Sequence, residues 1–292
     1  MINKKIFSMI SSVLMLSLTI VGCAKNESSD LFQTEREISV VARDAASGTR
    51  GAFHEIMGII QKEGDTVIDK LVVGALEFDG TDKVITTVEG DKYGIGYISL
   101  GSVSDRIKAV AVDGVEPSVE NVKSGNYSVA RPFLMVTKGT ESELVKDFIN
   151  FTQSTKGQEI VTEMNFIGAA DAPEEYTATG ISGTIKVAGS TSVTPVMEKL
   201  QESYTELNPN VKFEMQSNGS SQGIKAAIDG SYDIGMSSRE LKEDEASQLN
   251  KHVLAIDGIA VIINNENPTT NLAGEVITKI YTGEVTTWNE VE

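Results

Sequence analysis

The sequence predicts an α/β fold, and three observations support this prediction. Short runs rich in β-branched residues alternate with amphipathic segments along most of the chain, which is typical of α/β proteins. The chain of 292 residues is long enough for one large domain or two lobes. It contains a single cysteine, so no disulfide can form within it and an apolar core must hold the fold together.

Two periodicities predict the individual elements. Strands are expected where β-branched and other apolar residues cluster, at 38–42, 95–100, 109–112, 185–188, 211–215 and 259–264. Helices are expected where apolar residues recur at steps of three and four, at 51–62, 81–89, 141–152, 156–164, 194–207, 222–229 and 272–281. A polar stretch at 168–183 indicates an exposed connection between two compact halves.

The N-terminus has the pattern of a secretory signal. Lys4 and Lys5 precede an apolar run at 6–21, which is short for a membrane span and ends in a small residue before Cys23. A cysteine at this place resembles the bacterial lipobox. We therefore expect a lipoprotein signal peptide at 1–22, palmitate-type lipidation of Cys23 and a lipidated tether at 23–37. The protein is expected on the extracellular face of the cell membrane, held by its lipid anchor.

The chain is acidic, with a net charge of −17 that becomes −19 once the two lysines of the signal are removed. This charge argues against nucleic-acid binding, which needs a basic surface. It also gives no general attraction for an anion, so local dipoles and hydrogen bonds would have to hold one.

Three turns rich in Gly, Ser and Thr could hold an oxyanion. They lie at 47–49, 190–192 and 218–221, each between an expected strand and an expected helix. The first N–H groups of a helix lack intrahelical partners, and the helix dipole is positive there, so such a turn can bind phosphate or sulfate. Ordinary N-capping by Ser and Thr is the alternative for each turn.

Arginines near these turns could add charge to an oxyanion site. Arg43 ends the first expected strand, Arg50 follows the first turn, and Arg239 follows two serines later in the chain. A guanidinium fork suits a tetrahedral oxyanion. Surface ion pairs with the many acidic residues are the alternative, above all for Arg50 and Arg239.

A serine hydrolase is a rival hypothesis from another functional class. Residues 219–223 match the G-x-S-x-G pattern with Ser221 as nucleophile, and Asp233 and His252 follow in a suitable order. The spacing argues against it, because the histidine of that fold comes several strand–helix units later. With two histidines and no tight ligand spacing, neither a metal nor another cofactor is expected.

Seven short segments resemble the phosphate-binding proteins of phosphate ABC importers, the PstS type. They lie at 43–53, 94–98, 187–192, 217–223, 233–239, 257–261 and 280–288 and together span nearly the whole mature chain. Their order departs from the usual one, because the Ser-Gly-Thr segment precedes the Gly-Ser-Thr segment as in a circular permutation. Such a swap costs little where the termini lie close together at the surface.

The resemblance implies a two-lobed periplasmic-binding-protein type 2 fold of the Venus-flytrap kind. Mixed sheets flanked by helices would form the lobes, and two crossing strands would form the hinge. Mapped here, lobe 1 would comprise 38–130 plus 268–292, lobe 2 would comprise 131–267, and the hinge crossings would lie near 131–137 and 258–265. Closure about this hinge would bury the ligand.

The resemblance also implies the ligand, the ligand-binding residues and the partners. An ABC importer permease would receive inorganic phosphate from this binding protein, a monomer without enzymatic activity; another oxyanion such as sulfate or molybdate is the alternative. The implied phosphate-binding residues are Arg43, Ser47, Gly48, Thr49, Thr191, Ser192, Ser220 and Ser238, with Arg50, Ser190, Ser221 and Arg239 as further candidates.

Position 238 departs from the family pattern, which has an aspartate there that accepts a hydrogen bond from protonated phosphate and repels sulfate. Ser238 can still accept a hydrogen bond, but it carries no charge. Asp257 stands where other members have glycine. We therefore expect Asp257 to supply the missing acceptor; a purely structural aspartate at the hinge is the alternative.

Overall fold

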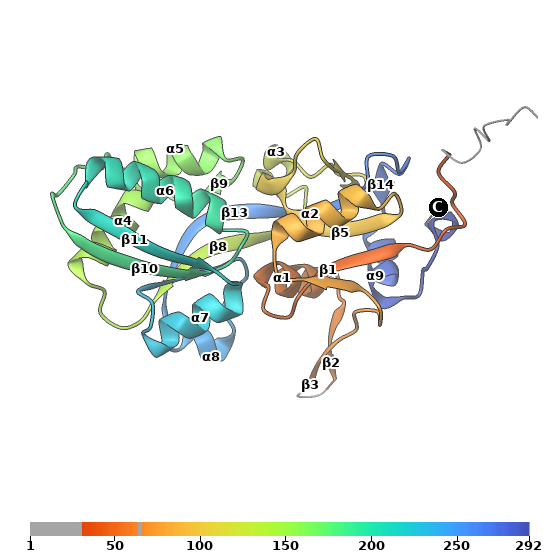
Figure 1. The fold of residues 1–292 in the computed structure, drawn as a ribbon, viewed down its shortest axis with the longest axis horizontal. Coiled ribbons are helices and arrows are strands. Elements are labelled where there is room, and N and C mark those ends of the chain that lie inside the picture. Colours follow the sequence, from red (N-terminus) through yellow and green to blue (C-terminus); the bar gives the residue numbers. More distant parts are fainter. Residues whose placement is uncertain (1–30, 64–65, 292) are drawn as a thin grey trace, which may run out of the picture. The chain divides into compact units, whose positions relative to one another are not determined.

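A ten-stranded mixed sheet forms the frame of the protein (Figure 1). This computed structural model describes residues 31–63 and 66–291, so the expected signal peptide and Cys23 lie outside the described residues. The strands of the sheet are β1 (Ser39–Arg43), β4 (Leu76–Phe78), β5 (Gly94–Ser99), β6 (Lys108–Ala109), β8 (Ala130–Thr137), β9 (Ile167–Gly168), β10 (Gly183–Gly189), β11 (Val211–Ser217), β12 (Ile234–Ser237) and β13 (Asn250–Ile263).

The helices alternate with these strands along the chain, as the periodicity predicts. They are α1 (Gly48–Ile56), α2 (Thr81–Gly90), α3 (Val119–Lys123), α4 (Glu143–Gln153), α5 (Thr155–Glu163), α6 (Thr194–Leu207), α7 (Ser220–Asp229), α8 (Glu243–Ala246) and α9 (Gly274–Thr282). Two 3₁₀ turns are η2 (Leu100–Ser102) and η3 (Trp288–Glu290). Two small pairs complete the structure: β2 (Ile60–Glu63) with β3 (Thr66–Asp69), and β7 (Ala111–Val112) with β14 (Asn271–Leu272).

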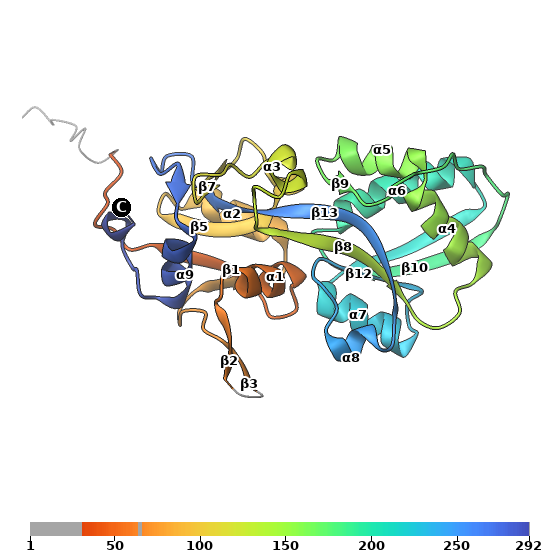
Figure 2. The same cartoon turned by 180° about the vertical axis from the view of Figure 1, so that it is seen from behind.

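The strand order is β11-β10-β12-β8-β13-β5-β1-β4, with β6 and β9 on β13. We call β5, β1 and β4 the first half of the sheet, and β11, β10 and β12 the second half. Neighbours within each half are parallel, whereas β8 and β13 run antiparallel to each other and to the adjoining strand of each half. Strands β8 and β13 therefore connect the two halves, as Figure 2 shows from behind.

Each half of the sheet carries apolar cores on both faces. On β13, Ile259 and Val261 pack into one core of the first half and Ala260 and Ile262 into the other, the alternation expected of a strand buried on both faces. In the second half, α4, α5 and α6 cover one face and α7 covers the other (Figure 1). Apolar burial thus holds the fold together in this cysteine-poor chain.

Strand β13 changes its partner between Gly258 and Ile259. Residues 250–258 pair with β8, and residues 259–263 pair with β5 and pack in the first half. The segment at 258–265, where the sequence predicts a hinge crossing, therefore lies mostly within the first half. The strand also begins at Asn250, nine residues before the predicted strand.

The first helix is shorter than its apolar periodicity predicts. Helix α1 ends at Ile56, whereas the pattern predicts a helix to residue 62. Gly58 adopts a left-handed φ of 68°, which ends the helix at low cost for a glycine, and residues Ile60–Glu63 then form a hairpin strand. The prediction for the last turn and a half of this helix is wrong for that reason.

Both ends of the described chain meet beside β1. The N–H of Ile38 donates to the carbonyl of Thr286 over 2.8 Å, and Phe32 packs against Tyr93 and Trp288. The polypeptide thus already contacts the domain from Phe32, within the segment 23–37 where the sequence predicts a lipidated tether. In the ranges that the structure describes, no helix is long and apolar enough to span a membrane.

Candidate functional site

Four helices begin around one cluster of hydroxyl groups. Helix α1 starts at Gly48 after its N-cap Ser47, α2 starts at Thr81, and α7 starts at Ser220. Helix α6 follows the turn at 190–193. Each helix follows a strand of the sheet, so its unpaired N–H groups and the positive end of its dipole lie at the strand's carboxyl end.

The second half of the sheet contributes three serines that contact one another. The hydroxyl of Ser190 donates to the hydroxyl of Ser238 over 2.9 Å, and the Oγ atoms of Ser220 and Ser238 lie 3.3 Å apart. The N–H of Ser238 donates to Ser220 Oγ over 3.0 Å. All three side chains are buried. Through these contacts, the predicted turns at 190–192 and 218–221 come together with Ser238.

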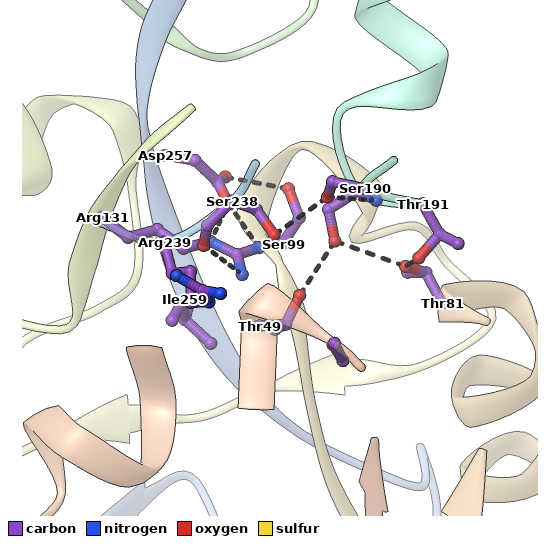
Figure 3. Close-up of polar contacts among 12 residues, drawn as sticks. Thr49, Thr81, Ser99, Arg131, Ser190, Thr191, Ser238, Arg239, Asp257 and Ile259 are labelled. Atoms are coloured by element: carbon purple, nitrogen blue, oxygen red, sulfur yellow. Dashed lines mark hydrogen bonds and ion pairs between the residues drawn. The ribbon is translucent and has the colours of Figure 1, made fainter. Parts of the chain in front are cut away.

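The turn of the first half reaches directly into this cluster. The hydroxyls of Thr49 and Ser192 lie 3.0 Å apart, and both residues are buried. A methyl group on Gly48 would lie 2.2 Å from Ser220 Oγ, closer than real contacts allow, so only glycine fits here. Figure 3 shows Thr49 and Thr81 from the first half beside Ser190 and Thr191 from the second.

Arg43 supplies a buried positive charge to the cluster. Its guanidinium donates to the carbonyls of Phe78 and Asp79 over 3.1 and 2.9 Å and to the hydroxyls of Thr81 and Thr191 over 3.3 and 2.9 Å. Burial lowers the pKa of Arg43, but a guanidinium remains charged in proteins. Within the described ranges, no carboxylate is among its hydrogen-bond or ion-pair partners.

The other two candidate arginines, Arg50 and Arg239, are paired with carboxylates. Arg50 contacts Asp69 and Glu77, and Arg239 forms a two-pronged ion pair with Glu245 over 2.7 and 2.8 Å. For both Arg50 and Arg239, ion pairs of this kind are the predicted alternative to ligand contact.

Asp257 lies buried behind the serines, at the point where β13 changes partner. Its Oδ1 accepts from Ser99 over 2.8 Å, and its Oδ2 accepts from the Nε and Nη2 atoms of Arg131 over 3.1 and 2.9 Å. Arg131 in turn donates to the carbonyl of Ser238 over 3.2 Å. Asp257 is thus connected to the cluster through Arg131 (Figure 3), and burial raises its pKa to about 6 against the pull of that guanidinium.

Sequence reasoning missed Thr81, Ser99 and Arg131. A Gly-Thr pair at the start of a predicted helix is the same signal as the three recognised turns, so Thr81 could have been found. No local pattern marks Ser99 or Arg131, because they join the cluster through strand pairing between distant segments.

The three residues of the hydrolase hypothesis form other contacts. Asp233 accepts from the backbone N–H of Lys186 over 2.8 Å, and the Nε2 of His252 lies 2.6 Å from Glu141. The N–H of Ser221 donates to the carbonyl of Ala46 over 3.1 Å. None of these contacts joins Ser221, Asp233 and His252 into a triad. Across residues 31–63 and 66–291, no group of His, Cys, Asp and Glu side chains could hold a metal ion.

Comparison with known proteins identifies the family. Residues 24–156 and 174–292 match the PBP superfamily domain. The chain is 41% identical over 273 residues to the phosphate-binding protein PstS 2 of Streptococcus pneumoniae, covering 94% of each chain. It belongs to the PstS family of phosphate-binding proteins. The PstS 2 protein of Streptococcus agalactiae is 42% identical over 276 residues, covering 93% of this chain and 92% of that one.

A solved structure shares this fold. The crystal structure of a phosphate-binding protein of a phosphate ABC transporter from Streptococcus pneumoniae matches with a TM-score of 0.73 and 43% identity. The match covers 88% of this chain and 100% of that one. The protein therefore has the periplasmic-binding-protein fold, as its resemblance to the family implies, and this fold is of the α/β class that the sequence pattern predicts.

Proposed function

We propose that this protein binds inorganic phosphate at the cluster around Arg43 and delivers it to the permease of an ABC importer. One observation supports the proposal above all others. Arg43 is 2% exposed, yet the groups that accept its hydrogen bonds are neutral oxygens. A buried charge is costly unless a counter-charge accompanies it, so the site is suited to an anionic ligand.

The surrounding groups suit a tetrahedral oxyanion. Hydroxyls of Ser47, Thr49, Thr191, Ser192, Ser190, Ser220 and Ser238 can turn to donate, and the N-termini of α1 and α7 add N–H groups. Because the chain carries a net charge of −17, these short-range donors must outweigh the electrostatic repulsion between the protein and an anion. We propose that three further candidates support the site without contacting the ligand: Arg50, Arg239 and Ser221.

The ligand would contact loops from both halves of the sheet. Thr49 and Arg43 belong to the first half, and Ser192 and Thr191 to the second. A ligand that contacts loops from both halves binds more tightly when these loops lie together. It therefore shifts the protein toward that arrangement. We propose that the two lobes close on phosphate by a hinge motion along β8 and β13, with residues 259–263 moving with lobe 1 and not, as the predicted bounds 131–267 have it, with lobe 2.

Selectivity for phosphate over sulfate requires an acceptor for the ligand's proton. Ser238 Oγ can accept this proton, and the carboxylate of Asp257 lies behind it in an ion pair with Arg131, which contacts the carbonyl of Ser238. We propose that the carboxylate of Asp257 is what disfavours fully ionised sulfate, because a serine hydroxyl by itself can also donate to a sulfate oxygen.

Export and anchoring complete the proposal. The signal pattern before Cys23 supports a lipoprotein on the extracellular face of the cell membrane, which acts as a monomeric binding protein and not as an enzyme. Cells grown with labelled palmitate should label the wild type and not a Cys23→Ala variant. Equal labelling of both would refute the anchor.

An anion panel tests the ligand. Thermal shift and calorimetry are run on the mature chain with phosphate, sulfate and molybdate, beside Arg43→Met and, as a matched control, Arg106→Met. Arg106 is half-exposed and paired with Asp82 and Glu89, so its loss should leave binding intact. Phosphate alone should stabilise the wild type and the control, by mass action. Stabilisation by sulfate or molybdate, or by no anion, would contradict the proposal.

A further inference from the structure

His54 is a buried histidine beside the anion site, and it is not among the residues proposed to contact phosphate. It lies on α1 with 0% exposure. Its Nδ1 lies 3.0 and 3.1 Å from the two carboxylate oxygens of Asp69, and its Nε2 lies 3.2 Å from the hydroxyl of Tyr97. The same hydroxyl accepts from the backbone N–H of Arg43 over 3.1 Å. A continuous chain of hydrogen bonds therefore runs from Arg43 to Asp69.

For a neutral imidazole, the donors and acceptors of this hydrogen-bond chain allow one arrangement of protons. The N–H of Arg43 can only donate, so the oxygen of Tyr97 accepts from it. A phenol oxygen can accept a second hydrogen bond, so the tautomer of His54 is decided at its other nitrogen. Nδ1 faces the carboxylate of Asp69, which only accepts, so the proton of a neutral imidazole sits on Nδ1 and is donated to Asp69. Nε2 of this neutral ring is then bare and accepts the hydroxyl proton of Tyr97.

The groups around the ring keep this arrangement in place. Asp69 on β3, Arg50 on α1 and Glu77 on β4 are the charged groups near it, with the rings of Tyr97 and Tyr281 packed at its sides. Burial lowers the pKa of His54 to about 4, against the pull of Asp69. A second proton on Nε2 would also leave the buried Tyr97 hydroxyl without this acceptor.

The hydrogen-bond chain provides a partner for the backbone N–H of Arg43, which strand pairing leaves without one. Strands β1 and β5 pair at Ser39 with Gly94 and at Val40 with Ile95, and their ladder ends there. Beyond that point, the side chain of Tyr97 takes the place of the strand backbone as partner of the Arg43 N–H. The residue held in this way is the one whose guanidinium reaches Thr191 in the other half of the sheet.

We propose that Tyr97 and His54 are positioning residues of the anion site, which fix the backbone of Arg43 so that its guanidinium is ordered before the ligand arrives. Neither residue touches the ligand. The inference rests on the proposed phosphate binding and extends it. A loop ordered in advance leaves less conformational entropy to be lost on binding, so the chain should strengthen affinity for phosphate.

Phosphate calorimetry on single-atom variants tests the proposal. Tyr97→Phe keeps the ring that stacks on Phe53 at 4.1 Å and removes only the oxygen. It should weaken phosphate binding about tenfold, because a buried N–H loses its partner. Tyr204→Phe is the matched control: Tyr204 is buried in the second half and donates to Asp147 over 2.5 Å. The phosphate affinity of Tyr204→Phe should stay within about twofold of the wild type, because substitutions at distant sites act independently.

Substitutions of His54 separate positioning from packing. His54→Leu removes the acceptor for the Tyr97 hydroxyl and should weaken binding several-fold. His54→Gln offers a side-chain oxygen that can accept there, and it should recover most of the loss. Equal affinities of Tyr97→Phe and the wild type, or no recovery in His54→Gln, would overturn the proposal.

The histidine tautomer provides a readout that needs no ligand. Nitrogen NMR of the imidazole rings is simplified by the presence of only two histidines, His54 and His252. His54 should show a protonated Nδ1 and a bare Nε2 from pH 7 down to about 5, given its lowered pKa. A protonated Nε2 would overturn the positioning chain even if phosphate binds. A wild type with this tautomer but without phosphate affinity would overturn the proposed function instead.

Discussion

The guanidinium of Arg43 donates to the hydroxyl of Thr191, 148 positions further along the chain, over 2.9 Å. This contact joins the end of β1 to the turn before α6, and so connects the two halves of the sheet. It places the buried charge of the site where both halves meet. The predictions below follow from this placement and from the groups behind it.

Replacing Arg43 with Met should abolish phosphate binding without unfolding the protein. The variant removes a buried charge that has no carboxylate partner in the described ranges, so the free protein should be as stable as the wild type or more stable. Calorimetry should show a loss of affinity of at least about 100-fold, as expected for a desolvated charged contact. Urea unfolding without phosphate checks the stability, and a large destabilisation would contradict the account.

Adding one methyl group at Gly48 should keep the loops apart. Its carbon would lie 2.2 Å from Ser220 Oγ and 2.7 Å from Ser238 Oγ, so the turn before α1 must move away from the second half. Gly48→Ala should weaken phosphate binding about tenfold or more, since misplaced contacts lose most of their energy. Gly90→Ala is the control, because a methyl group at Gly90 meets no atom within 4 Å. Equal affinities of the two variants would contradict the close approach.

Asp257→Asn should affect both stability and selectivity. The variant leaves the buried Arg131 without its carboxylate, which should cost about 3 kcal/mol of unfolding free energy. Adding Arg131→Met should recover part of this cost in a double-mutant cycle. If Asp257 influences the ligand's proton, the single variant should also bind phosphate more weakly and reject sulfate less. Unchanged affinities for both anions would show that this aspartate is structural.

Stability should fall between neutral pH and pH 5 because of His54. The unfolded histidine titrates near its ordinary pKa of 6.5, whereas burial lowers the folded pKa to about 4. The unfolded state therefore binds more protons in this window, and stability is present above pH 6.5 and is lost as the pH falls toward 4. The loss from pH 7 to pH 5 should be about 2 kcal/mol from this residue.

His54→Gln isolates that contribution. Burial raises the pKa of Asp257 to about 6, so its titration favours the folded state as the pH falls and opposes the effect of His54. Urea unfolding at pH 7 and pH 5 is therefore compared between the wild type and His54→Gln. The variant should lose about 2 kcal/mol less between the two pH values. An identical pH dependence would show that folding does not lower the pKa of His54.

Local pattern predicted most of the helices in the described residues but fewer than half of the strands, and not the strand pairing. Helix 194–207 was found to the residue because its apolar spacing is regular and Pro195 favours the first turn. The helix predicted at 51–62 ran too far because Ile59 and Ile60 continue its apolar spacing after Gly58 has ended it. The hairpin of Ile60–Glu63 and Thr66–Asp69 was missed because its residues lack a clear alternation.

Short stretches of sequence are enough to predict the chemistry of the site: hydroxyl-rich turns before helices, with Arg43 at the end of a strand. These signals are local, since capping and helix dipoles involve residues a few positions apart. The tertiary structure was needed to show that Arg43 is a buried arginine without a carboxylate partner in the described ranges, and that Asp257 contacts Arg131 and Ser99. The chain of Arg43, Tyr97, His54 and Asp69 likewise spans four separate elements. Such contacts depend on strand order and register, which no short stretch of sequence encodes.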